Sequence, residues 1–313
     1  MASPLHYYQP MMTTDVATGA LAAKLEIGIG ATSHPEPEQA VARAAVLAAS
    51  RLNGATPDVA LVLTAGAPMR DAVTSVRTVL GPVGVAGGDA PMLLTDHGPM
   101  NEGALVICIA SADGGASGVA ATSGHSLADA GQAAARLVLA GWPFRARYPR
   151  GLGLAFARAT EEGSSLAFLD SWRDFMGPKM RTVCSVLGGG ALYGCGDHAP
   201  MASVACLEAP YATGLGFAED GGLESAAEAM LTAVKRLDGR PPRLVLVIES
   251  VARYESLGAS APDEWAVMRG QLDASTPCVG WLSAQVAGYG RGVQPVDARH
   301  ALMVVAVGDS PRG

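Results

Sequence analysis

The chain has 313 residues, a formal net charge of −7 at pH 7, 49% hydrophobic residues and 16% charged residues. This acidic balance excludes nucleic acid and anionic membrane surfaces as main partners, because both require a field of Lys and Arg on one face. The length allows two domains, and the apolar content supplies a core without disulfides or metals. Residues 1–6 carry no signal-peptide pattern, so we expect a cytoplasmic protein.

Short Val, Leu and Ile runs alternate with Ala-rich segments and many glycines, which predicts an α/β protein with mixed α+β sheets. The first strands and helices that we expect are strand 24–30, helix 34–52, strand 58–64, helix 68–80 and strand 82–87. Segments 103–111 and 117–122 are expected to form an antiparallel pair around the turn signal Asp113-Gly114-Gly115. A helix at 126–139 follows.

The stretch 141–151 carries Trp142, two prolines and three arginines, and it breaks the periodicity, so we place a module boundary there. The later elements are strands at 152–157, 165–169, 181–187, 203–207 and 243–248, with helices at 223–237 and 263–272. The predicted organisation is an N-terminal lead at 1–23, an α/β module at 24–145, a second copy at 146–210 and a further module at 211–313.

The most informative pattern is a repeat: the sequence Asp96-His97-Gly98-Pro99-Met100 returns 101 residues later as Asp197-His198-Ala199-Pro200-Met201. A pair of glycines precedes each copy, and a short apolar strand-like run follows it. A weaker third copy places His300 before the run 301–307. The period is too long for a solenoid or a propeller blade, so the repeat indicates duplication of domain-sized modules.

The repeated histidines have two interpretations. His97 or His198 could be an axial haem ligand oriented by the neighbouring Asp, or each could pack beside a turn that Asp and Pro stabilise. Cys195 and His198 have the spacing of a metal half-site, but the sequence shows no second half-site, and we predict no metal. Cys195 lies between glycines in an expected loop and is therefore the most reactive thiol. The cysteines in apolar runs, expected to be buried and free, are Cys108, Cys206 and Cys278.

Two glycine clusters are candidate ligand-binding sites. Gly87, Gly88 and Asp89, and likewise Gly188 and Gly189, lie at expected strand ends, where backbone N–H groups could hold a carboxylate or a phosphate. Close backbone packing at tight turns explains the same glycines equally well. Neither cluster has a dinucleotide or P-loop fingerprint.

The order of the elements resembles the FIST family of bacterial sensory proteins over about residues 24–309. The resemblance rests on the Gly28-to-Gly30 strand, strand 58–64, the glycines at 187–190 and a pairing of 243–249 with 278–281. It implies a stand-alone protein that binds a small molecule, such as an amino acid or another carboxylate. It also implies signalling through a separate histidine kinase or cyclic-dinucleotide enzyme. Assembly into a homo-oligomer stays open.

The family's C-terminal motif matches Arg253, Tyr254, Trp281 and Gln285, which are therefore candidate ligand-binding residues. Arg253 could clamp a ligand carboxylate or lie in solvent. The chain departs from the family at Ser250, where a Cys is usual, and at Gln285, where a Glu is usual. Some relatives look like haem-binding nitric oxide sensors, which makes haem, held by His97, His198 and Cys195, the alternative within sensing.

An enzyme is the alternative from another class. Duplicated α/β chains also occur in ring-opening amidohydrolases, whose repeats each supply a Ser and a Lys. The three lysines here, Lys24, Lys179 and Lys235, lie far from any repeated Ser-Gly motif, and the chain has no G-x-S-x-G elbow. The sequence therefore predicts no catalytic residue. A scaffold protein without a pocket is a third alternative.

Overall fold

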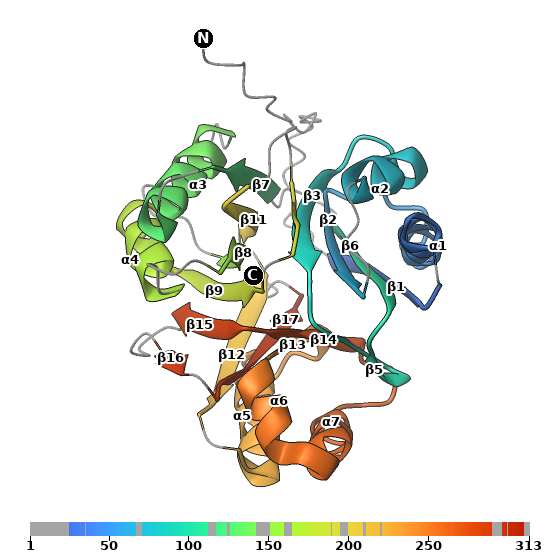
Figure 1. The fold of residues 1–313 in the computed structure, drawn as a ribbon, viewed down its shortest axis with the longest axis vertical. Helices are drawn as coiled ribbons and strands as arrows, with labels where there is room; N and C mark the ends of the chain where they lie inside the picture. Colours follow the sequence, from blue (N-terminus) through green and yellow to red (C-terminus); the bar gives the residue numbers. More distant parts are fainter. Residues whose placement is uncertain are drawn as a thin grey trace.

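Three mixed β-sheets stand around a common centre in the computed structural model of the chain, with their helices on the outside (Figure 1). The fold is therefore an internally duplicated α/β fold, as the sequence predicts. The structure describes residues 25–34, 36–66, 71–111, 117–123, 126–141, 151–159, 165–188, 190–194, 200–208, 211–219, 221–289, 296–298 and 300–309.

The described elements fall into three units of similar order along the chain. The first unit contains β1 (Leu25–Thr32), α1 (Pro37–Ser50), β2 (Val59–Ala65), α2 (Ala72–Leu80), β3 (Gly84–Asp89), β4 (Leu93–Thr95), β5 (Gly98–Met100) and β6 (Gly103–Ser111). The second contains β7 (Ser117–Thr122), α3 (Leu127–Gly141), β8 (Gly151–Arg158), α4 (Ser165–Met176), β9 (Met180–Leu187), β10 (Leu192–Tyr193) and β11 (Ala202–Glu208). The third contains β12 (Ala212–Ala218), α5 (Leu223–Lys235), β13 (Pro242–Ser250), α6 (Val251–Leu257), the 3₁₀ turn Gly258–Ser260, α7 (Ala261–Arg269), β14 (Cys278–Ser283), β15 (Gln285–Tyr289), β16 (Val296–Ala298) and β17 (Leu302–Gly308).

Four strands of each unit pair in the same way. The first strand pairs antiparallel with the last, the last pairs antiparallel with the second, and the second pairs parallel with the third. This pattern gives the orders β1-β6-β2-β3, β7-β11-β8-β9 and β12-β17-β13-β14. The expected pairing of 243–249 with 278–281 is confirmed, because β13 and β14 are parallel neighbours.

The remaining short strands cross from one unit to the sheet of another. The β4–β5 hairpin of the first unit extends the third sheet beside β14, and β15 and β16 of the third unit extend the second sheet beside β9. Strand β10 of the second unit extends the first sheet beside β3, where Tyr193 pairs with Gly87. Each unit therefore gives strands to one neighbour and receives strands from the other.

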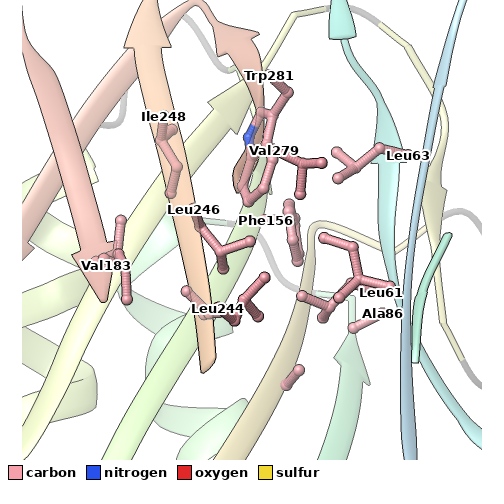
Figure 2. Close-up of a cluster of buried hydrophobic side chains, with 14 of the residues drawn as sticks. Leu61, Leu63, Ala86, Phe156, Val183, Leu244, Leu246, Ile248, Val279 and Trp281 are labelled. Carbon is pink, nitrogen blue, oxygen red and sulfur yellow. The ribbon is translucent and has the colours of Figure 1, made fainter. Parts of the chain in front are cut away.

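The inner faces of the three sheets meet in one apolar core. Leu61 and Leu63 of the first unit, Phe156 of the second, and Ile248 and Trp281 of the third converge there (Figure 2). The rings of Phe156 and Trp281 lie 5.6 Å apart between centroids. Three further clusters fill the space between each sheet and its own helices. The common centre is thus packed with side chains.

Glycines bring a helix unusually close to its sheet in two units. A Cβ atom added to Gly30 of β1 would lie 1.9 Å from the carbonyl oxygen of Ala44 in α1. A Cβ atom added to Gly216 of β12 would lie 1.7 Å from the carbonyl oxygen of Ala229 in α5. The same steric requirement therefore holds at equivalent positions of the first and third units, in each of which only a glycine fits.

Two expectations from the sequence are wrong. Segments 103–111 and 117–122 do not pair, because β6 joins the first sheet and β7 pairs with β11 in the second. Segment 165–169 is the start of helix α4, in which Phe168, Trp172 and Met176 are buried at helical spacing. The module boundary expected at residue 145 falls inside the second unit, between α3 and β8. The boundary expected at residue 210 falls where the second unit meets the third, at the junction of β11 and β12. Among the described helices, none has the length and apolar character to cross a bilayer.

Candidate functional site

The first glycine cluster lies within the sheet. Gly87 and Gly88 belong to β3, paired with β2 on one side and with β10 on the other. The N–H of Gly87 donates to Oγ of Ser203 at 3.3 Å, and a Cβ atom on Gly87 would lie 1.8 Å from the carbonyl oxygen of Val62. Close packing thus accounts for these glycines, and ligand binding by them stays a prediction. Gly188 follows β9 with open space around it, and Gly189 lies outside the described residues.

Asp89 joins two units through its side chain. Its carboxylate accepts hydrogen bonds from the hydroxyls of Thr64 and Tyr193, and its Oδ2 accepts the N–H of Ala191 at 2.8 Å. The hydroxyls of Thr64 and Tyr193 also lie 2.6 Å apart. The carboxylate is therefore engaged in anchoring the crossing strand β10 to β3, and its expected role as a ligand-binding group stays a prediction.

His97 lies on the surface, in the two-residue turn that joins β4 to β5. Its N–H donates to Oγ1 of Thr95 at 3.2 Å, which agrees with the turn interpretation of the repeated motif. His198 and Cys195 lie outside the described residues, so haem ligation stays a prediction. Within the described ranges, no three His, Cys, Asp or Glu side chains are grouped to hold a metal ion.

The cysteines that the structure describes are buried and free, as expected for Cys108, Cys206 and Cys278. Burial raises the pKa of Cys108 and of Cys278 to about 12, so these thiols stay protonated at neutral pH. Burial also raises the pKa of Cys206. Protonated thiols inside strands are poor nucleophiles, and we assign them to packing.

Arg253 is completely buried behind the third sheet. It lies in the first turn of α6, where its backbone N–H donates a hydrogen bond to Oγ of the capping residue Ser250 at 3.2 Å. Its Nε and Nη2 donate to Oε1 of Glu264 at 3.0 and 2.5 Å, and Nη2 also lies 3.1 Å from the carbonyl oxygen of Gly222. Arg253 is thus not in solvent, and the carboxylate that it clamps belongs to the protein.

A second carboxyl group, that of Glu249, lies beside this ion pair. Glu249 stands near the end of β13 and is 2% exposed, whereas Glu264 of α7 is 1% exposed. Outside the pair itself, no donor of the described residues reaches Oε1 of Glu249 or Oε2 of Glu264, so the hydrogen bond between the two side chains is the contact that these groups share. Burial, the charge of Glu264 and a hydrogen bond with that side chain raise the pKa of Glu249 to about 9, against the opposing effect of Arg253. Glu249 therefore carries a proton at pH 7.

The four residues expected to form one C-terminal ligand site do not lie together. Tyr254 is half-buried near Glu249, and burial together with the Glu249 charge raises its pKa. Trp281 points from β14 into the common core, on the opposite face of the sheet (Figure 2). Gln285 begins β15 and pairs with Val186 in the second sheet. Only Arg253 and Tyr254 border the carboxyl pair.

Sequence reasoning missed both glutamates, although each left a signal. Glu249 lies within a run of buried residues in β13, where an ionisable group is costly unless it is paired. Glu264 lies on the buried face of α7 together with Ala261, Trp265 and Met268. A carboxylate inside an apolar stripe is rare without a partner. The partner could not be identified before the fold placed α7 over β13.

Chemically, the pair combines an acid with a base. The Arg253 guanidinium is paired with Oε1 of Glu264, whereas Glu249 holds a proton beside it. One carboxyl group can then donate a proton while the other accepts one, which is the division of roles that coupled carboxyl pairs perform in enzymes.

Neither a family model nor a curated protein sequence matches the chain. Among solved structures, it is similar to the cyanuric acid hydrolase from A. caulinodans, with a TM-score of 0.51 and 13% identity over 91% of this chain and 99% of that chain. A cyanuric acid hydrolase described as evolutionary innovation by structural concatenation scores 0.46 at 10% identity, over 91% of this chain and 100% of that chain. PurLQS from Thermotoga maritima scores 0.30 at 12% identity, over 92% and 73% of the two chains. The first likeness shows the fold alone, and the two lower scores carry no argument.

The described residues do not form the Ser and Lys pair that the amidohydrolase alternative requires. Lys179 and Lys235 are exposed, and Lys24 lies outside the described residues. Ser185 and Ser283 are buried beside the common core, with their hydroxyl oxygens 2.9 Å apart. Their other hydrogen bonds are to the indole N–H of Trp281 and to backbone carbonyls. These serines therefore connect the second and third units, and their hydrogen bonds within the described residues involve no basic side chain.

Proposed function

We propose that this chain is an enzyme of the duplicated α/β class, a hydrolase in which Glu249 and Glu264 act as general acid and general base. The observation that carries the proposal is the buried carboxyl pair, in which Glu249 has a raised pKa and a hydrogen bond with Glu264, while Arg253 holds Glu264 from the other side. Strongly perturbed pKa values concentrate at functional sites. The fold similarity to a hydrolase supports the same class without identifying a substrate.

In the proposed reaction, the Glu264 carboxylate accepts a proton from a water molecule, and the oxygen of that water attacks an amide carbonyl carbon. Glu249 donates its proton to the carbonyl oxygen, which gives a neutral tetrahedral intermediate. The carbon–nitrogen bond then breaks as Glu264 gives the nitrogen the proton taken from water, and Glu249 recovers its proton from the hydroxyl group that becomes the new carbonyl. Arg253 holds Oε1 of Glu264 through two donors, and Oε2 takes up the water when the hydrogen bond between the two carboxyl groups opens. Arg253 thus acts as a positioning residue.

Access to the pair requires movement, because both glutamates are almost fully covered. Tyr254 on α6 is only half-buried and lies near Glu249, and Gly222 before α5 accepts a hydrogen bond from Arg253. We propose that substrate enters on the side of Tyr254, because the other faces of the pair are covered by β13 and α7.

The test uses cyanuric acid and other six-membered cyclic imides as probes, with ring opening followed by the loss of ultraviolet absorbance. Glu249→Gln and Glu264→Gln are each expected to lower kcat at least about a hundredfold, since general acid–base catalysis contributes on that order. Glu255→Gln on the same helix α6, where Glu255 is exposed, is the matched control and should retain turnover. Absence of turnover by the wild type on all probes would count against cyclic-imide hydrolysis.

A second readout addresses the pair itself. Infrared difference spectra across the pH range should show the carbonyl band of a protonated carboxyl group at neutral pH in the wild type and its absence in Glu249→Gln. Retained turnover in Glu249→Gln would overturn the assignment of that residue even if the spectra agree. Ligand sensing through a separate output protein, which the FIST resemblance implies, stays a prediction.

A further inference from the structure

We propose that a cleft between the first and third units binds a small organic oxyanion, a molecule with a carboxylate or phosphate group on a short apolar body. The cleft has a volume of about 240 Å³ and is bordered by β1, the end of α1, the β4–β5 turn and the segment between α7 and β14. It lies apart from the residues of the carboxyl pair, none of which lines it. The proposal is independent of the proposed hydrolase activity.

Charge is the first argument. The cleft is lined by the guanidinium groups of Arg51 and Arg269 and by the carboxylate of Asp96, so one positive charge is in excess. The Asp96 carboxylate is 53% exposed, and its Oδ1 lies 3.6 Å from Nε of Arg269. This distance exceeds that of a hydrogen bond, so the ion pair leaves Arg269 able to attract a second anion.

Both arginines are held in place by backbone carbonyls. Nη1 and Nη2 of Arg269 donate to the carbonyl oxygens of Asp273 and Ala274 at 3.2 and 2.9 Å. Nη1 of Arg51 donates to the carbonyl oxygen of Ile29 at 2.6 Å. Guanidinium groups that are already fixed lose little freedom when an anion binds, which favours affinity. These backbone carbonyls therefore fix the two guanidinium groups on the positively charged side of the cleft.

The remaining lining explains why the ligand is organic. Half-buried Ile27 and buried Ile29 of β1 line the cleft with apolar residues, and Ser275 and Thr276 line it together with the arginines. A bare inorganic ion would leave the apolar lining uncovered, whereas a short carbon chain would bury it. The volume lies below the usual range for drug-sized ligands, so a small metabolite fits better than a nucleotide.

The internal repeat supplies a matched control. Arg236 follows α5 as Arg51 follows α1, and its Nη1 donates to the carbonyl oxygen of Leu215 at 2.6 Å. Arg51→Ala and Arg236→Ala thus remove the same structural hydrogen bond from equivalent positions. Only Arg51 lines the cleft, so only Arg51→Ala removes positive charge from it. The comparison separates loss of binding from loss of stability.

The experiment is calorimetric titration of the full chain at low salt with succinate, a monocarboxylate such as butyrate, and inorganic phosphate. We expect saturable one-to-one binding of at least one organic anion, weakened about tenfold or more by Arg51→Ala and unchanged by Arg236→Ala. Asp96→Asn should tighten the same binding, because it removes the competing negative charge. A response to phosphate alone would overturn the organic class.

Three results would overturn the site: no saturable binding of any probe, equal weakening by Arg51→Ala and Arg236→Ala, or binding that Asp96→Asn weakens. Melting temperatures of the variants without ligand serve as the stability reference. A drop in melting temperature shared by the two Arg variants, with binding lost only in Arg51→Ala, supports the site.

Discussion

The backbone N–H of Leu25 donates a hydrogen bond to Oδ1 of Asp309 at 3.2 Å, across a separation of 284 residues. Arg243 of the third unit stands beside both, with Nη2 3.2 Å from the carbonyl oxygen of Leu25 and Nε 3.7 Å from Oδ1 of Asp309. The first strand of the first unit is thus attached to β13 and to the end of the third unit. The two ends of the described chain meet, and the three units are connected all round.

This closure predicts that the chain tolerates circular permutation. A variant in which a short Gly-Ser linker joins residues 309 and 25, with new ends in the open turn between Asn53 and Gly54, should fold, because no sheet pairing is cut. Cooperative urea unfolding with a midpoint near that of the wild type is the expected result. A permutant that is aggregated or molten would show that connectivity, rather than contacts, determines the fold.

Glu249 predicts a pH dependence of stability with a definite sign. Its pKa is about 9 in the folded chain against 4.5 for a free glutamate, so between these values the folded state holds a proton that the unfolded state releases. The free energy of unfolding should therefore fall as the pH rises, by up to about 1.4 kcal/mol per pH unit from this group. Below about pH 4.5 this stabilisation is fully present.

Urea unfolding at about pH 5.5, 7 and 8.5 measures this effect as the difference between Glu249→Gln and wild type. The free energy of unfolding of Glu249→Gln should rise relative to that of the wild type as the pH rises, because glutamine does not titrate. Glu255→Gln, on the exposed side of α6, should show a constant difference. A difference for Glu249→Gln that does not vary with pH would contradict the raised pKa.

The close approach of helix and strand predicts strong effects of single methyl groups. Gly30→Ala and Gly216→Ala should each lower the free energy of unfolding by about 1–3 kcal/mol or more, because their Cβ atoms would overlap carbonyl oxygens of α1 and α5. Gly188→Ala, with no atom within 4 Å of its Cβ, should change it by less than about 0.5 kcal/mol. Chemical unfolding measures these free energies. Similar values for the three variants would show that α1 and α5 can move away from their strands without cost.

The anchoring of β10 predicts the effect of removing one hydroxyl. Tyr193→Phe removes one of the hydrogen bonds that the Asp89 carboxylate accepts, and it also removes the contact between the hydroxyls of Tyr193 and Thr64. We expect a loss of about 1–3 kcal/mol in the free energy of unfolding. Amide hydrogen exchange should quicken where Leu192 pairs with Gly88. Unchanged protection there would mean that backbone pairing alone holds β10.

Local patterns predicted the elements well where one periodicity dominated. The buried run that became β13 and the Ala-rich helix that became α1 were both expected near their observed bounds. Segment 165–169 was misassigned because five apolar and small residues fit a strand as well as the first turn of a helix. The repeat around His97 predicted duplication, but the third unit was recognised only weakly.

What the sequence could not predict are the contacts between distant segments. The pairing of β10 with β3 joins residues about a hundred positions apart, and neither segment indicates which edge it will join. The same holds for Glu264, whose partner Arg253 is visible only after α6 and α7 have packed against β13. A glycine pair such as Gly87-Gly88 has the same sequence whether it serves an anion or a crowded sheet.

The passing of short strands from unit to unit has one more consequence. The first unit extends the third sheet, the third extends the second, and the second extends the first, so every sheet is completed by a segment from elsewhere in the chain. This is the geometry of a domain-swapped homotrimer whose three protomers have been fused end to end. In that view, the segments that join the units keep them close together but do not determine the fold. An isolated unit would be an incomplete protomer, stable only in the company of two others.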